Sequence, residues 1–299
     1  MKLKQILLIV LMMLVPLSMS AQKYKRKGHA KTTIKIRQKS KTNSRKSYLP
    51  TVNLAAELQK LSQNMVKIEG GKFMMGATQE QEGEAEANES PAHRVKLNTF
   101  YMCKYEVTQA LWIGVMKQQP SYFKGLDLPI ESVSWDDCQK FIKRLNQLTG
   151  KHYRMPTEAE WEYASRGGKL SKKQTFSGSN NLLDVAWFDE NSADSTHIVG
   201  SKQPNELGLY DLSGNVWEWC EDDFEPYTDD NIDLTKNKHN APASDATNGA
   251  NSGEFRSGKV IRGGSWNRDL SACRTTKRDN YGPEFSNFAI GLRLVATEM

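Results

Sequence analysis

The chain has 299 residues, of which 38% are hydrophobic and 25% are charged. This length allows one large domain or two modest ones, and the apolar content supports a packed core, which excludes a wholly disordered chain. The net charge of +6 hides an asymmetry, because 13 of the 41 Lys and Arg lie in residues 1–50, which hold no Asp or Glu. Residues 51–299 therefore carry 28 basic and 35 acidic side chains, so the globular part is acidic.

Residues 1–21 have the pattern of a secretory signal peptide. Two lysines precede an apolar run over 6–17, and small residues, Ser20 and Ala21 among them, follow it. The run is shorter than the ~20 residues that cross a bilayer, which excludes a polytopic membrane protein and favours a cleaved signal over an uncleaved anchor. We expect an exported protein, periplasmic or associated with the outer membrane. No Cys follows the run, so the usual lipoprotein signal is missing.

Residues 22–50 form a basic segment with few large apolar side chains. Such a composition predicts a disordered tail. The tail is either a polycation that binds an anionic surface or a solvated linker, and it carries no specific nucleic-acid motif. Residues 51–64 favour a short helix that leads into the domain.

The next segments alternate strands and turns. Residues 65–69 and 72–76 predict two strands around the turn at Gly70-Gly71, and residues 95–97 and 100–102 predict a further strand pair. Each run is short and apolar and is bounded by polar or glycine residues.

Three helices have clear start signals. Ser134 with Asp137, and Thr157 with Glu160, are capping boxes in front of apolar residues at helical spacing. Thr108 caps a third helix. Beyond residue 170 the chain is turn-rich, and residues 226–258 predict a long surface loop. We therefore expect one domain over residues 65–299.

Six segments, in order along the chain, resemble a single family. They are Phe100-Tyr101-Met102-Cys103-Lys104-Tyr105-Glu106-Val107-Thr108, Pro129-Ile130-Glu131-Ser132-Val133-Ser134-Trp135-Asp136-Asp137, Arg154-Met155-Pro156-Thr157-Glu158-Ala159-Glu160-Trp161-Glu162-Tyr163-Ala164, Gly208-Leu209-Tyr210-Asp211-Leu212-Ser213-Gly214-Asn215-Val216-Trp217-Glu218-Trp219, Arg262-Gly263-Gly264-Ser265-Trp266 and Gly291-Leu292-Arg293-Leu294-Val295. The chain resembles the formylglycine-generating enzyme family, or sulfatase-modifying factor domains, from about Val66 to Ala296. The resemblance implies an α+β, C-type-lectin-like fold of the formylglycine-generating-enzyme type, with little regular secondary structure.

The catalytic members of this family oxidise a sulfatase cysteine to formylglycine at a cysteine pair that binds copper(I). The family spacing places that pair three and eight positions beyond Ser265, which are Arg268 and Cys273 here. Copper(I) selects soft thiolate ligands. One thiolate beside a guanidinium does not make a two-sulfur site, so the sequence argues against oxidase activity. In an active protein, Cys273 and Ser265 would be the catalytic residues.

The remaining cysteines leave alternatives open. Cys220 follows the Trp-Glu-Trp segment, so Cys220 and Cys273 form a disulfide, form a different copper site, or are structural thiols. Pairing of Cys103 and Cys138 is undetermined by the sequence.

The resemblance also implies a structural calcium or sodium site. Its ligands would be the side chains of Asp211 and Glu218 and the carbonyls of Gly214 and Val216, because hard cations prefer oxygen. The alternative is that both carboxylates only hydrogen-bond the loop.

Three tryptophans, Trp217, Trp219 and Trp266, either line a peptide or glycan cleft or belong to the core, where large aromatic side chains usually lie.

The export pattern, the retained fold motifs and the incomplete cysteine pair favour a non-oxidising binding or scaffold module of the bacterial envelope. Related domains of the gliding-motility and type IX secretion machinery are similar in this respect. The expected partner is an envelope protein or an exported peptide. Two alternatives are a copper-dependent formylglycine-generating oxidoreductase and a calcium-dependent glycan- or peptide-binding protein.

Overall fold

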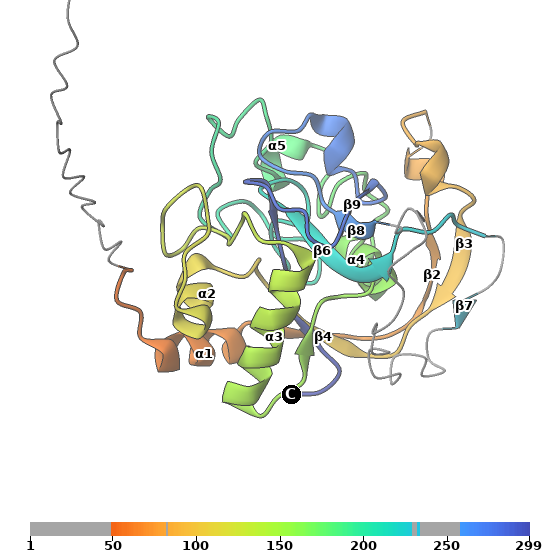
Figure 1. The fold of residues 1–299 in the computed structure, drawn as a ribbon. Coiled ribbons are helices and arrows are strands. Elements are labelled where there is room, and N and C mark those ends of the chain that lie inside the picture. Colours follow the sequence, from red (N-terminus) through yellow and green to blue (C-terminus); the bar gives the residue numbers. More distant parts are fainter. Residues whose placement is uncertain (1–48, 82, 229–231, 234–257) are drawn as a thin grey trace, which may run out of the picture. The chain divides into compact units, whose positions relative to one another are not determined.

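The computed structural model describes residues 49–81, 83–228, 232–233 and 258–299 (Figure 1). The predicted signal peptide, the basic tail up to residue 48 and most of the predicted loop 226–258 lie outside these residues. Within the described ranges, no helix has the length and apolar character needed to cross a membrane.

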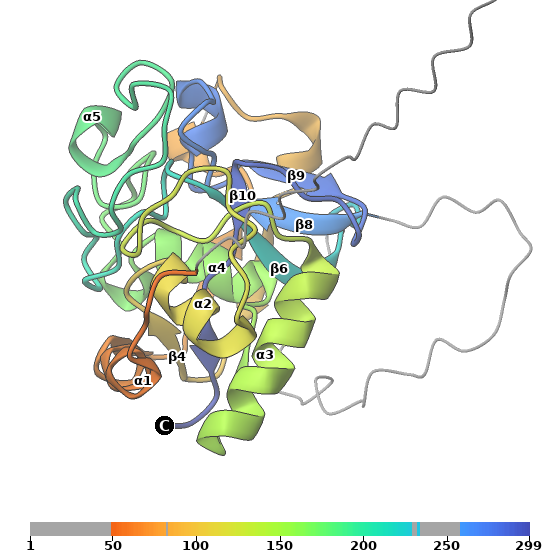
Figure 2. The ribbon, with the colours of Figure 1, turned by 60° about the vertical axis from the view of Figure 1, so that its left-hand side comes forward.

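Short strands form three sheets. The first has the order β1 (Met65–Ile68), β4 (Phe100–Cys103), β11 (Val295–Ala296) and β5 (Tyr153–Arg154). The second has the order β10 (Ile290–Gly291), β6 (Trp217–Asp223), β8 (Lys259–Arg262) and β9 (Arg278–Tyr281), and Figure 2 shows it beside α4. The third has the order β2 (Lys72–Met75), β3 (His93–Lys96) and β7 (Ile232–Asp233).

The four predicted strands form, but both predicted pairings are wrong, because neither pair of neighbours joined by a turn is hydrogen-bonded together. β1 pairs with β4, and β2 pairs with β3, so the chain changes sheet both at Gly70-Gly71 and between β3 and β4. A Cβ atom at Gly70 would lie 2.4 Å from the carbonyl oxygen of Leu97. The two crossings therefore pack backbone against backbone, and only glycine leaves the space for it.

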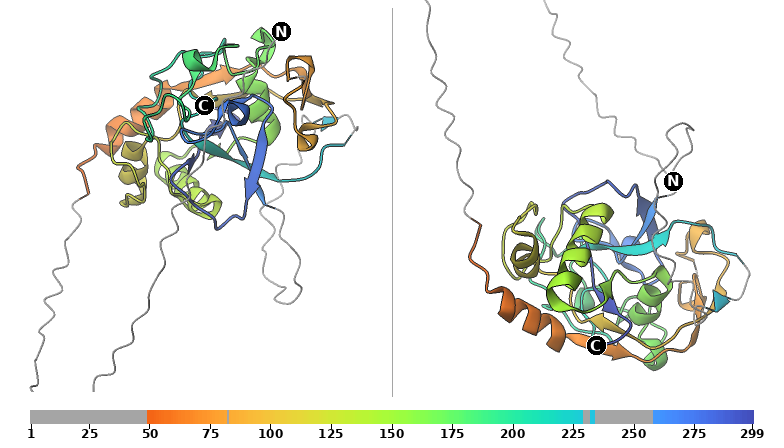
Figure 3. Two further views of the ribbon diagram at one scale, coloured as in Figure 1. Left: turned by 90° about the horizontal axis from the view of Figure 1, so that it is seen from above. Right: turned by 60° about the horizontal axis from the view of Figure 1, so that its bottom comes forward.

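The predicted helices are present, and the caps predicted at Thr108, Ser134 and Thr157 are confirmed. α1 (Leu54–Gln63) begins after Asn53, and α2 (Gln109–Met116) begins after Thr108. α3 (Trp135–Thr149) and α4 (Glu158–Ser165) both start with a complete capping box. Figure 3 shows α1 continuing into β1 along one side of the domain.

The remaining elements are single turns and one strand in an unexpected place. The turns are η1 (Gln79–Gln81), η2 (Ala87–Glu89), η3 (Gly168–Leu170), α5 (Leu182–Val185) and η4 (Leu270–Cys273). β7 lies inside the predicted loop 226–258 and pairs in parallel with β3, so that segment is not loop throughout.

α4 packs against β2, β6 and β8, and its Trp161 is fully buried. The third sheet and the second sheet thus meet on the same helix. β8, which packs on this helix, leads into the segment where the family resemblance places the cysteine site.

Candidate functional site

The turn after β8 lies directly over a cysteine. Gly263 and Gly264 have φ values of 101° and 76°, which favour glycine. A Cβ atom at Gly264 would lie 2.7 Å from Cys273 Sγ, so the thiol sits beneath the turn. Ser265 is buried, and its hydroxyl donates to Asn267 Oδ1 at 2.9 Å. The structure therefore places Cys273 beneath the turn that leads into Ser265.

Cys273 is fully buried in an apolar cluster. Its neighbours in the cluster are Phe176, Leu182, Val185, Ala186 and Phe188. Burial raises the pKa of the Cys273 thiol, and the charges of Asp269 and Asp189 raise it further. The thiolate is the form that binds metals and reacts, so this cysteine has the character of a structural thiol.

Cys220 lies in β6 and belongs to a different cluster, with Trp161 and Val260. All four cysteines are within the described ranges, and all are free and buried. The Cys220–Cys273 disulfide that the sequence left open is therefore not formed. Because Cys220 and Cys273 pack into separate clusters, they do not fit a two-sulfur copper site either.

The predicted cation site is built around Glu218, which is already paired. Arg293 donates to Glu218 Oε1 at 2.6 Å and to Oε2 at 3.0 Å, and Trp161 Nε1 donates to Oε2 at 2.8 Å. Both charged side chains are fully buried. Glu218 thus neutralises the Arg293 guanidinium, which the sequence prediction did not include.

Asp211, unlike Glu218, has one carboxylate oxygen that accepts no hydrogen bond from the described residues. Its Oδ2 accepts from Gly200 N at 2.7 Å, whereas the buried Oδ1 receives no hydrogen bond from the described part of the chain. Burial raises the pKa of Asp211 to about 6, and the negative charge of Glu218 contributes. A cation would offset this charge, so Asp211 fits the predicted calcium or sodium site.

A further carboxylate, Glu106, joins this group and was not singled out from the sequence. Its Oε1 accepts from Val216 N at 3.1 Å and its Oε2 accepts from Asn215 Nδ2 at 2.6 Å. Burial and the charges of Asp211 and Glu218 raise the pKa of Glu106 well above its ordinary value. Gly214 N donates to Gly263 O at 2.7 Å, which ties the loop to the turn over Cys273.

Among the described residues, no group of three His, Cys, Asp or Glu side chains is arranged around one metal position. The calcium or sodium site stays a prediction.

Next to Ser265, four aromatic rings form a surface that we call the aromatic platform: Tyr122, Phe123, Trp266 and Phe288. Trp266 contacts Phe123 edge-on at 5.3 Å and Phe288 at 5.7 Å between ring centroids. Tyr122 is 70% exposed and Phe288 is 43% exposed. Trp and Tyr are enriched among the few residues that dominate the binding energy of protein interfaces. Of the three predicted tryptophans, only Trp266 belongs to this surface, because Trp217 and Trp219 are core residues.

Buried polar groups hold the platform in place. Glu131 Oε1 accepts from the backbone N–H of Phe123 at 2.9 Å, and Trp266 Nε1 donates to the carbonyl of Phe288 at 3.1 Å. Ser132, which follows Glu131, has φ of 61° and donates from its backbone N–H to Asn287 O at 2.9 Å. A non-glycine residue in this conformation costs energy and recurs at binding sites. The platform is therefore preorganised.

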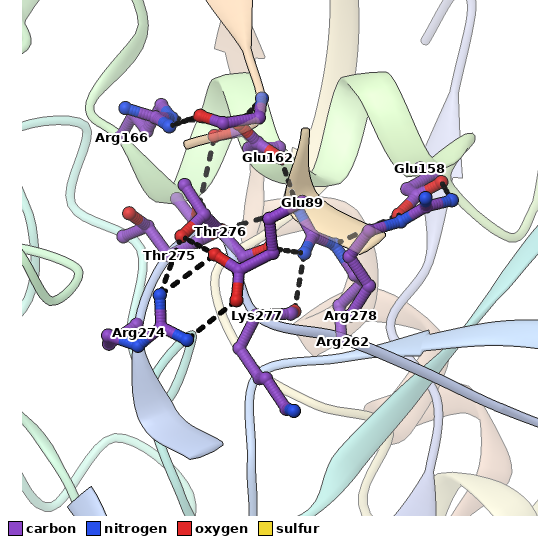
Figure 4. Close-up of polar contacts among 12 residues, drawn as sticks. Glu89, Glu158, Glu162, Arg166, Arg262, Arg274, Thr275, Thr276, Lys277 and Arg278 are labelled. Atoms are coloured by element: carbon purple, nitrogen blue, oxygen red, sulfur yellow. Dashed lines mark hydrogen bonds and ion pairs between the residues drawn. The ribbon is translucent and has the colours of Figure 1, made fainter. Parts of the chain in front are cut away.

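A buried ionic network fixes the segment after Cys273 (Figure 4). Arg274 makes a bidentate pair with Glu89 at 2.6 and 2.8 Å, and Thr276 Oγ1 donates to Glu89 at 2.6 Å. Burial opposes ionisation of Glu89, but the hydrogen bonds and charge of Arg274 and the bond from Thr276 together hold its pKa below the ordinary value.

The network continues to α4. Arg278 pairs with Glu158 at 2.7 and 2.8 Å, and Arg262 pairs with Glu162, which also accepts from Arg166. Arg274 and Arg278, which follow Cys273, are thus structural cations. Arg262, at the end of β8, also donates to the carbonyls of Thr276 and Lys277, so the network joins the strand before the turn to the segment after Cys273.

The chain is similar in sequence to proteins of one known family. A family model described as a sulfatase-modifying factor enzyme 1-like domain matches residues 51–298. The chaperone protein LppX of Paenibacillus barcinonensis is 34% identical over 210 residues, covering 54% of this chain and 71% of that protein. The formylglycine-generating enzyme of Streptomyces coelicolor is 32% identical over 182 residues, covering 55% of this chain and 51%, about half, of the enzyme.

A solved structure agrees with these relatives. Treponema denticola variable protein 1 superposes with a TM-score of 0.66 at 28% identity, covering 78% of this chain and 94% of that one. The predicted α+β fold of the formylglycine-generating-enzyme type, which is related to C-type-lectin-like folds, is confirmed. Because the family model covers residues 51–298, the chain belongs to the sulfatase-modifying factor enzyme 1-like family, the family of the formylglycine-generating enzymes.

Proposed function

We propose that this chain is a non-oxidising binding module of its family, exported to the cell envelope, where the aromatic platform binds an envelope protein or an exported peptide. The observation that carries the proposal is Cys273. It is fully buried in an apolar cluster without a second thiol, and Arg268 occupies the position of the family's first cysteine. Copper(I) needs soft, deprotonated sulfur ligands, and a protonated buried thiol is a poor one.

Copper binding tests the first part of the proposal, that the protein does not oxidise cysteine. We expect reduced protein to bind copper(I) more weakly than micromolar, and we expect no formylglycine when a sulfatase-derived cysteine peptide is added with oxygen and copper. Titration and mass spectrometry of the peptide are the measurements. Arg268→Cys restores two cysteines at the family spacing and should bind copper(I) at least tenfold more tightly. Turnover by the unmodified chain would overturn the proposal.

Partner capture tests the binding half. Tyr122 and Phe288 are exposed, so replacing both with Ala should leave the protein folded, as thermal unfolding checks, while reducing cross-linked capture of the partner from the native envelope by at least tenfold. Leu148→Ala is the matched control, because Leu148 is 49% exposed at the end of α3. Equal capture by the double variant and the control would remove the platform from the proposal.

Export is tested separately. Cell fractionation shows where the protein is located, and mass spectrometry of the mature N-terminus tests cleavage near residue 21.

A further inference from the structure

A second concave surface lies away from Ser265, beside the edge strand β2. The cavity measures about 380 Å³, which is within the range of small-molecule sites. It is bounded by β2, by η1 and by the chain that runs from the end of α4 to Lys173. Its lining includes Lys72, Phe73, Met74, Glu80, Arg166 and Lys173. None of them belongs to the aromatic platform or to the predicted cation site.

One wall of this cavity is apolar. Phe73 and Tyr163 contact each other with ring centroids 5.2 Å apart, and Met74 of the same strand is 39% exposed. Methionine and aromatic side chains accommodate a planar or apolar group. The wall therefore suits the body of a ligand rather than an ion alone.

The charge of the cavity runs against that of the domain. Three cations, Lys72, Arg166 and Lys173, line it with a single carboxylate, Glu80. In three other cavities of the molecule carboxylates outnumber cations, in keeping with the acidic composition of residues 51–299. A positive cavity in a negative protein concentrates the field and attracts anions.

The two lysines are available for a ligand, whereas the arginine is not. Arg166 is committed to Glu80, Glu162, Thr78 and the carbonyl of Gly76. Lys72 and Lys173 are exposed, and within the described ranges neither ammonium group has a carboxylate partner. The neighbouring Lys172 and Lys169, by contrast, pair with Glu206 and Glu69.

The backbone at Lys173 is also unusual. Its φ is 58°, in the left-handed region that favours glycine, and its N–H donates to Ser171 Oγ at 3.2 Å. A lysine held in this conformation at a cavity is consistent with a positional requirement for its side chain.

We propose that this cavity binds a small ligand with an oxyanion group attached to an apolar or planar body. The oxyanion is a carboxylate, a sulfate or a phosphate, and it lies between the ammonium groups of Lys72 and Lys173. The body packs on Phe73 and Met74. Lysine is a compact point charge with three donors, which suits a tetrahedral or planar oxyanion reached from two sides. This site is independent of the function proposed for the aromatic platform.

Aromatic anions test the proposal on the purified full chain. Phenyl phosphate, phenyl sulfate and benzoate are titrated by calorimetry, and whichever binds most tightly identifies the oxyanion. We expect the Lys72→Gln/Lys173→Gln double variant to bind that probe at least tenfold more weakly, because both charges are lost from exposed positions. Lys172→Gln is the matched control, since it removes an adjacent lysine outside the cavity, and it should bind like the unmodified chain.

Two further probes test separately whether the ligand needs its charge and whether it needs its apolar body. Benzyl alcohol, which is uncharged, and inorganic phosphate, which has no apolar body, should each bind at least tenfold more weakly than the best probe. Saturable binding by none of the three aromatic anions, or equal binding by the double variant and the control, would overturn the proposal. Binding of inorganic phosphate as tight as that of phenyl phosphate would overturn the role of the apolar wall.

Discussion

Replacing Arg274 with Gln is expected to lower the free energy of unfolding by about 3–5 kcal/mol, the range for removing one partner of a buried ion pair. Arg274 and Glu89 are both buried and form a bidentate pair. Glutamine cannot supply the charge, so the buried carboxylate of Glu89 would lose its counter-charge. Urea unfolding followed by tryptophan fluorescence measures the change.

Lys277→Gln is the control, because Lys277 pairs with the more exposed Glu86 next to the same network. Lys277→Gln should lower the free energy of unfolding by no more than about 1 kcal/mol, as for surface pairs.

The pH dependence of the free energy of unfolding gives a second check. The pKa of Glu89 is lowered, so the pair stabilises the protein above the unfolded value of about 4.3 and this stability is lost as the pH falls through the folded pKa. The deficit of Arg274→Gln should therefore shrink in acid. A deficit that is small at neutral pH or grows in acid would contradict the buried pair.

Replacing Glu218 with Gln is expected to have a cost of similar size, again about 3–5 kcal/mol, whether or not calcium is present. Arg293 would keep its buried positive charge without the carboxylate that accepts its hydrogen bonds. Thermal and urea unfolding in calcium and in chelator measure the difference. A deficit that appears only in calcium would instead make Glu218 a metal ligand.

Asp211→Asn is the matched variant for the predicted cation site. Calcium should raise the melting temperature of the unmodified chain, since a ligand that binds only the folded state stabilises it. Asparagine can still accept the hydrogen bond from Gly200, but it lacks the charge of Asp211. The variant should therefore fold and lose the calcium response. An unchanged response in Asp211→Asn would remove Asp211 from the site.

The sequence predicted features that depend on neighbouring residues. The caps at Ser134 and Thr157 lie three residues from the groups they bind, so the pattern alone located both helix starts. The six motifs identified the family for the same reason, because each is a continuous segment. The pairing of β1 with β4, by contrast, depends on the close approach of Gly70 to Leu97, which no local pattern announces.

The candidate site was predicted in part. Ser265 and Cys273 lie close in sequence, and the turn that carries Ser265 covers Cys273, whereas the Cys220–Cys273 disulfide that the sequence left open is not formed because the two side chains pack into separate clusters. The aromatic platform joins Tyr122, Trp266 and Phe288 from three distant loops. Its only sequence signal was Trp266.

By itself, then, the sequence determined the family, the helix starts and the absence of a second cysteine at the position of Arg268, since each of these is fixed by residues a few positions apart. The tertiary structure alone decided that Glu218 neutralises Arg293, that Glu89 neutralises Arg274, and that Lys72 and Lys173 line one cavity together. The physical reason is that an ionised group in the interior must find its counter-charge in space, and the partner can come from any part of the chain.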